Sequence, residues 1–110
     1  MAYSREEITD IFTKMAERLA TAKTDGINAA VQFDLSGENG GMYWLKIADG
    51  KSEVGEGAVD NPKMTLKATA DDLAAVLSGA TNPMQAFMQG KIKIQGDTGL
   101  AMKLMPLING

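Results

Sequence analysis

Apolar and polar residues alternate along this chain in two periods, one typical of helices and one typical of strands. Ser4 and Glu7 form a capping box at the start of the first helical stretch. Ile8, Phe12 and Leu19 follow at helical spacing, so a helix is predicted to end near residue 23. Period-2 alternation then predicts four strands, with glycine-containing turns between them, at residues 29–35, 42–48, 51–58 and 63–69.

The last third of the chain carries signals for three short helices and one strand. Thr69 is a suitable cap for the first of these helices, and Gly79 is expected to end it. Asn82 caps the second helix, which Gly90 ends. Residues 91–96 alternate as a strand with its isoleucines inward. The residues expected on the inner face of the second helix are Met84, Phe87 and Met88.

The third helix of this region is predicted to run from Asp97 or Thr98 to about Met105, because Pro106 disfavours helical conformation in the residue before it. The helix is apolar nearly all round, and only Lys103 offers a charge to water. An ordinary surface helix needs one apolar stripe about 100° wide. This helix therefore needs a second apolar neighbour, which could be the centre of the domain, another subunit, a membrane surface or a ligand.

The predicted order is helix, four strands, two helices, strand and helix, which indicates an α+β fold. Antiparallel hairpins account for the first three strands, and helices are expected on one face of the sheet only. A chain of 110 residues has room for one globular domain, so residues 1–110 are interpreted as a single domain.

Composition removes most catalytic chemistries. The chain contains no cysteine and no histidine, which excludes thiolate nucleophiles, serine–histidine triads and the commonest zinc ligands. The acidic pairs Glu6-Glu7 and Asp71-Asp72 lie in the first turns of predicted helices, where negative charge stabilises the helix dipole. We therefore predict no catalytic residue, no metal site and no cofactor.

Charge and hydropathy also limit the partners. The formal net charge of −3 argues against nucleic acid, because nucleic-acid binding requires a basic stripe. No apolar run approaches the roughly 18 residues of a membrane span, and the first residues do not resemble a signal peptide. We expect a cytoplasmic protein without a membrane span, for which transient membrane contact remains possible.

Methionine and the single tryptophan allow more than one interpretation. Methionine is flexible and polarisable, and it recurs at surfaces that accept varied apolar partners. A methionine-rich segment can therefore be ordinary core or the lining of a cavity. Trp44 is equally open, since it could be a surface aromatic, a core residue under a helix or a ligand contact. The methionines in question are Met84, Met88, Met102 and Met105.

Several runs in the last third of the chain are similar to one known family. The longest is NPMQAFMQGK at residues 82–91, followed by IKIQGD at 92–97 and GLAMKL at 99–104. The Leu77-Ser78-Gly79 helix end fits the same pattern, and the order of elements is similar over the whole chain. The chain thus resembles the sterol carrier protein type-2 domain.

This resemblance implies a five-stranded mixed sheet with helices covering one face, and an apolar tunnel between the sheet and the C-terminal helices. It implies binding and transfer of sterols, fatty acids or fatty acyl-CoA without catalysis. Gln85, at the family's glutamine position, would be a polar group near the ligand, and Trp44 is a further candidate contact. The residues that map onto the tunnel wall are Val76, Leu77, Met84, Phe87, Met88, Leu100, Met102 and Met105.

Two functional hypotheses follow. The first is a non-catalytic carrier that binds one apolar lipid in an internal tunnel, as a monomer or a homodimer. The alternative is a protein-interaction or dimerisation module in which the second apolar face of the last helix meets another subunit. An enzyme that uses only Asp, Glu or Lys is a third, less favoured class.

Overall fold

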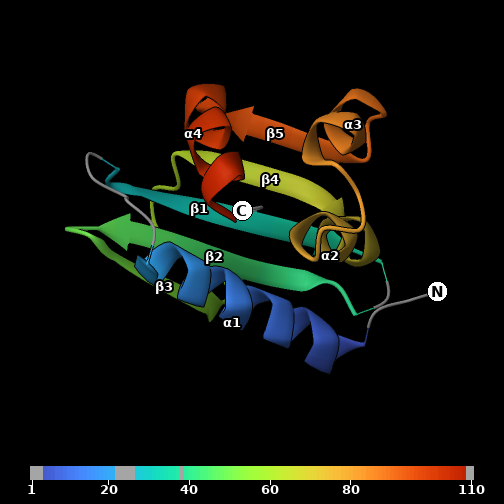
Figure 1. Cartoon of the computed structure of the whole chain (residues 1–110), viewed down its shortest axis with the longest axis horizontal. Coiled ribbons are helices and arrows are strands. Elements are labelled where there is room, and N and C mark those ends of the chain that lie inside the picture. The colour runs from blue at the N-terminus through green and yellow to red at the C-terminus, as the bar shows by residue number, and fades with distance from the viewer. Residues whose placement is uncertain (1–3, 22–26, 38, 109–110) are drawn as a thin grey trace.

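The computed structural model describes residues 4–21, 27–37 and 39–108, without the side chains of Thr21 and residues 105–108. Within these ranges the chain forms four helices and five strands, in the order expected from the sequence (Figure 1). In chain order the elements are α1 (Arg5–Thr21), β1 (Ala29–Ser36), β2 (Gly41–Ala48), β3 (Lys51–Glu56), β4 (Met64–Thr69), α2 (Ala70–Leu77), α3 (Pro83–Met88), β5 (Ile92–Gly96) and α4 (Thr98–Ile108).

The five strands form one mixed sheet in the order β3-β2-β1-β4-β5. The hairpins β1–β2 and β2–β3 are antiparallel, and so is the pair β4–β5. Strand β4 crosses back to lie parallel to β1, which makes the sheet mixed. The α+β architecture with a five-stranded mixed sheet is therefore confirmed.

All four helices cover the same face of the sheet, with α1 over β2 and β3 and with α4 near β4 and β5 (Figure 1). The strands alternate, so every second residue points toward this face. On β2, for example, Tyr43, Leu45 and Ile47 are buried, whereas Lys46 between them is exposed. The buried side chains of the sheet and the helices form one continuous apolar core.

On the opposite face, Gln32 is a buried polar side chain that ties the segment after β3 to the sheet. Its amide nitrogen donates hydrogen bonds to the carbonyl oxygens of Tyr43, at 2.8 Å, and Gly57, at 3.0 Å. Its amide oxygen accepts from the Val59 N–H at 2.7 Å. Buried polar groups need partners of this kind, because an unpaired one is costly to remove from water.

The expected helix caps are confirmed. Ser4 and Glu7 bond reciprocally, with the Ser4 N–H donating to Glu7 Oε1 at 3.0 Å and the Glu7 N–H to Ser4 Oγ at 3.1 Å. The Thr69 hydroxyl accepts from the Asp72 N–H at 3.0 Å. Asn82 Oδ1 accepts from the Met84 N–H at 2.9 Å.

Several boundaries differ from the expectation. Helix α4 continues through Pro106 to Ile108, past the end expected near Met105. The fixed φ of proline is close to the helical value, so the chain keeps its helical course although proline lacks an N–H for the helix. Strand β3 ends at Glu56 rather than at residue 58, since Gly57 adopts a φ of +101° that lies outside the strand region. Helix α1 is described to Thr21, and its expected end near residue 23 lies outside the described residues.

The prediction of which residues form the inner face of α3 is wrong. The structure buries Pro83 and Ala86 instead of Met84, Phe87 and Met88. Pro83 and Ala86 are three positions apart and compact, so they allow this short helix to approach the rest of the domain closely. The three large side chains, at positions i, i+3 and i+4, consequently point outward.

Candidate functional site

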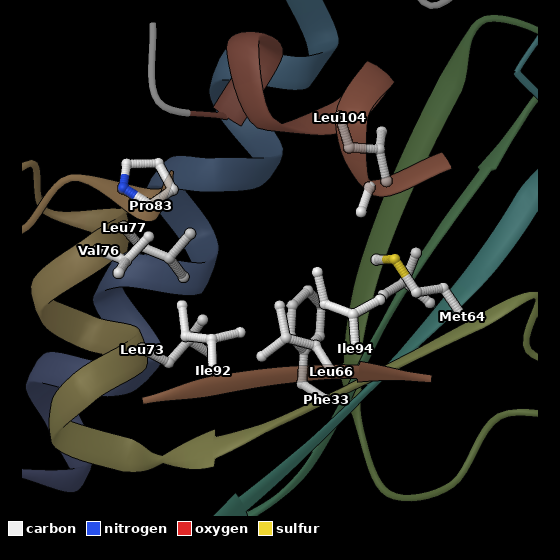
Figure 2. A pocket seen from close by; sticks show the side chains of 12 residues that line it. Phe33, Met64, Leu66, Leu73, Val76, Leu77, Pro83, Ile92, Ile94 and Leu104 are labelled. Carbon is white, nitrogen blue, oxygen red and sulfur yellow. The ribbon is translucent and has the colours of Figure 1, made fainter. Parts of the chain in front are cut away.

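A small apolar cavity lies between the sheet and the C-terminal helices. Its volume is about 50 Å³, and side chains from β1, β4 and β5 form its floor. Side chains of α2 and α3 form one wall, and those of α4 lie across from them (Figure 2). Every lining residue is apolar, and the set comprises Val31, Phe33, Met64, Leu66, Leu73, Val76, Leu77, Pro83, Ile92, Ile94, Ala101 and Leu104.

Strand register brings the floor residues together. Phe33 pairs with Leu66 across β1 and β4, and Leu66 pairs with Ile94 across β4 and β5. Directly paired residues lie on the same face of a sheet, so these three side chains form a row beneath the helices. Val31 and Met64 form a second pair in the floor. The floor therefore depends on contacts between strands that are far apart in the sequence.

Helical spacing produces the walls. Leu73, Val76 and Leu77 lie at positions i, i+3 and i+4 of α2 and share one face of that helix. Helix α2 starts at Ala70, directly after β4, so wall and floor are joined without a loop. In α4, Ala101 and Leu104 are three apart and face the same cavity.

The cavity is too small for a long-chain ligand in this conformation. An apolar cavity that holds one benzene molecule measures about 150 Å³, three times the volume found here. A lipid chain would therefore require α3 or α4 to move away from the sheet. The elongated tunnel implied by the family resemblance is not present among the described residues.

The structure places only two of the sequence-predicted site residues in the cavity wall, Val76 and Leu77. Leu100 is buried, but it borders a separate, partly polar hollow together with Lys63 and Asp97. Trp44 pairs with Gln32 and lies on the helix-free face of the sheet. Strand alternation sets this placement, because its neighbours Tyr43 and Leu45 occupy the helix-covered face.

The remaining candidates lie at the surface. Gln85 is exposed, and the exposed fractions of Met84, Phe87, Met88 and Met102 are 49%, 44%, 80% and 61%. The side chain of Met105 lies outside the described part of the chain. Among the side chains that the structure describes, Met84 and Met88 on α3 and Met102 on α4 thus lie at the outer surface and not in the cavity wall.

Ten of the cavity residues were not among the sequence candidates. Six of these lie on strands, where alternation indicates the inward residues but does not reveal which strands are neighbours. Ile92 and Ile94 were predicted to point inward and do line the cavity. Pro83 occupies the first position of α3, and the sequence contained no signal that it would contact a cavity.

The comparisons with known proteins agree with this architecture. The model of the SCP-2 sterol transfer family matches residues 8–109. The chain belongs to the SCP-2 sterol transfer family. This membership confirms the resemblance inferred from the runs at residues 82–104.

One curated relative is human hydroxysteroid dehydrogenase-like protein 2, which is 34% identical over 103 residues, or 93% of this chain and 25% of the relative. The chain therefore spans about a quarter of the length of that SCP-2 relative. The solution structure of sterol carrier protein domain 2 of Helicoverpa armigera is also similar, with a TM-score of 0.77 and 30% identity over 92% of this chain and 84% of that one.

Two mosquito proteins share the SCP-2 fold at lower identity. The crystal structure of Sterol Carrier Protein 2 Like 2 from Aedes aegypti has a TM-score of 0.78 and 22% identity, covering 94% of this chain and 98% of that one. Sterol Carrier Protein-2 from Aedes aegypti in complex with palmitate has a TM-score of 0.73 and 21% identity, covering 98% and 96%.

None of the helices in the described residues combines the length and the apolar character that a membrane span requires. The same part of the chain contains no group of three or more side chains suited to hold a metal ion.

Proposed function

We propose that this SCP-2 domain binds the hydrocarbon part of one lipid between the sheet and helices α2–α4, and carries that lipid without covalent chemistry. The observation that carries the proposal is the all-apolar lining of the cavity between the sheet and helices α2–α4. Family membership and the mosquito relative solved with palmitate support a fatty acyl or sterol-like ligand.

The polarity of the cavity indicates how such a ligand would lie. A charged carboxylate or a coenzyme A group has no hydrogen-bond partner among the lining residues. Burying a charge without partners is far more costly than burying a methylene. The hydrocarbon tail would therefore occupy the space over Phe33, Leu66 and Ile94, with the polar end at the surface.

The energetics allow the cavity to open. Each methylene moved from water into an apolar site contributes about 0.8 kcal/mol. Ten buried methylenes would contribute about 8 kcal/mol, which equals a micromolar Kd if opening cost nothing. The cost of moving α3 or α4 reduces this affinity. Helices α3 and α4 contact the rest of the domain partly through the buried alanines Ala86 and Ala101. Because alanine is small, moving these residues away from their neighbours exposes little apolar surface.

The sequence candidates divide accordingly. Val76 and Leu77 are proposed as direct wall contacts. Met102 and the α3 residues would reach a ligand only after their helices rotate, and Trp44 lies on the opposite side of the sheet. A shift in tryptophan emission on ligand binding is therefore not expected from direct contact.

A cavity-filling substitution tests the proposal. In Ala101→Phe, an aromatic ring would project from α4 into the space that the tail needs. Palmitate, measured by its displacement of a fluorescent fatty acid, should bind this variant about five- to thirtyfold more weakly, since about one or two kcal/mol of chain burial would be lost. Ala80→Phe, at an exposed position after α2, is the matched control. Unchanged palmitate binding by a folded Ala101→Phe variant would contradict this site.

The alternative function, dimerisation through the outer face of α4, is favoured by the high exposure of Met102. Gel filtration at several protein concentrations, with and without palmitate, distinguishes the two. A monomer that binds palmitate supports the carrier, whereas a dimer that Met102→Ser dissociates and that does not respond to palmitate supports the interaction module.

The proposed role is non-catalytic, although the human relative is named as a dehydrogenase-like protein. The match to that relative covers only 25% of its length. Its name therefore does not assign an activity to this domain. In such longer proteins, we propose that a domain of this kind holds an apolar molecule beside other domains.

A further inference from the structure

Of the four helices, α3 is the one least firmly attached to the rest of the domain. Its buried residues are Pro83 and Ala86, whereas its three large apolar side chains are 44–80% exposed. Helix α2 buries five of its eight residues, and the residues that α4 buries include Leu100 and Leu104. Moving α3 away from the domain therefore exposes less apolar surface than moving α2 or α4.

The backbone hydrogen bonds of α3 do not tie it to its neighbours. Asn82 accepts from N–H groups of the first turn, and the Lys91 N–H closes the other end by donating to the Ala86 carbonyl oxygen at 2.9 Å. Among the described residues, no hydrogen bond of the helix extends beyond these two ends. The start of α4 differs, because the Asp97 N–H donates to the Lys63 carbonyl oxygen at 2.9 Å.

A glycine lies on each side of α3. Gly79, after α2, has a φ of +85°, and Gly90, after α3, has a φ of +76°. Glycine enters and leaves such angles without steric cost, and hinges are formed by a few residues at the ends of elements. Between these glycines, the described hydrogen bond to α2 is from the Thr81 N–H to the Ala75 carbonyl oxygen, at 3.0 Å. Little hydrogen bonding therefore opposes rotation of the segment.

The inner side of α3 closes one wall of the cavity. Pro83 lies beside Val76 and Leu77 of α2, and Ile92 of β5 lines the cavity nearby (Figure 2). Outward movement of α3 removes Pro83 from this wall and opens the cavity between α2 and β5. The floor of the cavity, formed by β1, β4 and β5, does not change in this movement.

We propose that α3 is the gate of the cavity. It swings outward about Gly79 and Gly90, and the hydrocarbon tail of the ligand passes between α2 and β5. Helix α4 keeps its place, because Leu100 and Leu104 anchor it in the core. The gate rests on the proposed lipid carriage for its purpose, but the opening of α3 is a property of the free protein. The opening can therefore be measured without a ligand.

Hydrogen exchange of the free protein tests the opening. A helix of six residues does not keep its hydrogen bonds in water once it is detached, since isolated helices shorter than about 12 residues are marginal. The N–H groups of Ala86 and Gln89 should therefore exchange at least about a hundredfold faster than that of Leu66 in β4. The N–H group of Leu104 in α4 should exchange more slowly than both α3 groups. Equal protection of α3 and β4, or faster exchange in α4, would overturn the gate.

Two other glycines provide a matched control for the hinges. Gly37 and Gly50, which lie in the turns after β1 and β2, have φ angles of +85° and +76°, the same as those of Gly79 and Gly90. An added Cβ meets no atom within 4 Å at any of the four positions. Alanine therefore introduces similar backbone strain in both pairs, and it causes no collision in either.

Gly79→Ala/Gly90→Ala should raise the exchange rates of the α3 N–H groups by at least about fivefold, because rotation at the hinges releases the strain. Dissociation of palmitate, measured as its replacement by an excess of a fluorescent fatty acid, should accelerate by a similar factor. Gly37→Ala/Gly50→Ala should lower the urea midpoint comparably and leave both rates unchanged. The single variants Gly90→Ala and Gly50→Ala serve if a double variant does not fold.

The gate and the lipid carriage fail in different ways. If the folded protein binds no palmitate, the carriage fails, and the exchange rates alone decide whether α3 opens. If palmitate binds but leaves the hinge variant and the control variant at the same rate, the gate is overturned and the carriage stands. Faster dissociation and faster α3 exchange in the hinge variant alone support the gate.

Discussion

The helices cover the two halves of the sheet in different ways. Under α1, Phe12 stacks on Tyr43 with ring centroids 4.6 Å apart and meets Phe33 edge-on at 5.1 Å. Under α2–α4, the sheet meets the helices around a cavity, and the alanines 86 and 101 are among the buried contacts. One half is filled by large, interlocking side chains, whereas the other contains free volume.

This difference assigns separate roles to the two halves. Aromatic pairs with such geometry stabilise a core beyond the area they bury. A region with a void and small contact residues loses fewer contacts when its layers separate. The α1 half should therefore hold the sheet in shape while the C-terminal helices move to admit a ligand.

Phe12→Ala should have the largest effect on stability. The ring is buried and contacts two other aromatic rings, so its removal should lower the free energy of unfolding by about 3–5 kcal/mol. Urea denaturation followed by circular dichroism measures the change. A loss below about 1 kcal/mol would show that the α1 half is not the rigid part.

Leu104→Ala probes the other half. Leu104 is buried on α4 and lines the cavity. We expect the free energy of unfolding to fall by about 2–3 kcal/mol, at the low end for such a truncation, because existing free volume helps the site to relax. Palmitate binding by the folded variant should be equal to or stronger than that of the unchanged chain. Weaker binding, at a temperature where the variant is fully folded, would argue against the cavity as the ligand site.

Tyr43→Phe should raise stability slightly. The Tyr43 hydroxyl is buried and has no hydrogen-bond partner in the described structure. Replacing it by hydrogen removes an unpaired polar group and leaves the Phe12 stacking in place, so a gain of about 1 kcal/mol is expected. A higher denaturation midpoint at unchanged m-value would support this. Destabilisation would reveal a partner for the hydroxyl, such as an internal water.

Met102→Lys should have the smallest effect. The methionine is 61% exposed on α4, so a lysine can extend into water and stability should change by less than about 0.5 kcal/mol. The sequence alone indicated a ligand contact at this position. Palmitate affinity decides that point: unchanged affinity limits the site to the inner side of α4, and lost affinity shows that α4 rotates on binding.

The features that could be predicted from the sequence are local ones. The helix caps at Ser4, Thr69 and Asn82 depend on residues two or three positions apart, and all three are present. Strand alternation likewise places Ile92 inward. Such short-range patterns, together with the family resemblance, were sufficient for the fold class and the order of the elements.

The features that could not be predicted depend on distant parts of the chain. Which side of α3 is buried depends on how close Pro83 and Ala86 come to their neighbours, and apolarity favoured the larger methionines instead. The residues that form the cavity floor can be named only when it is known how β1 pairs with β4 and how β4 pairs with β5. The face occupied by Trp44 follows from alternation, but the side on which the helices lie is a property of the whole sheet.

One measurement tests the central claim directly, namely that a lipid tail lies between the sheet and the C-terminal helices. In a complex with palmitate, nuclear Overhauser effects should connect the methylene groups of palmitate to the methyl groups of Ile94 and Leu104. The methyl groups of Leu45 and Ile47, under α1, should show none. Contacts with Leu45 and Ile47, or with none of these four residues in a saturated complex, would contradict the account.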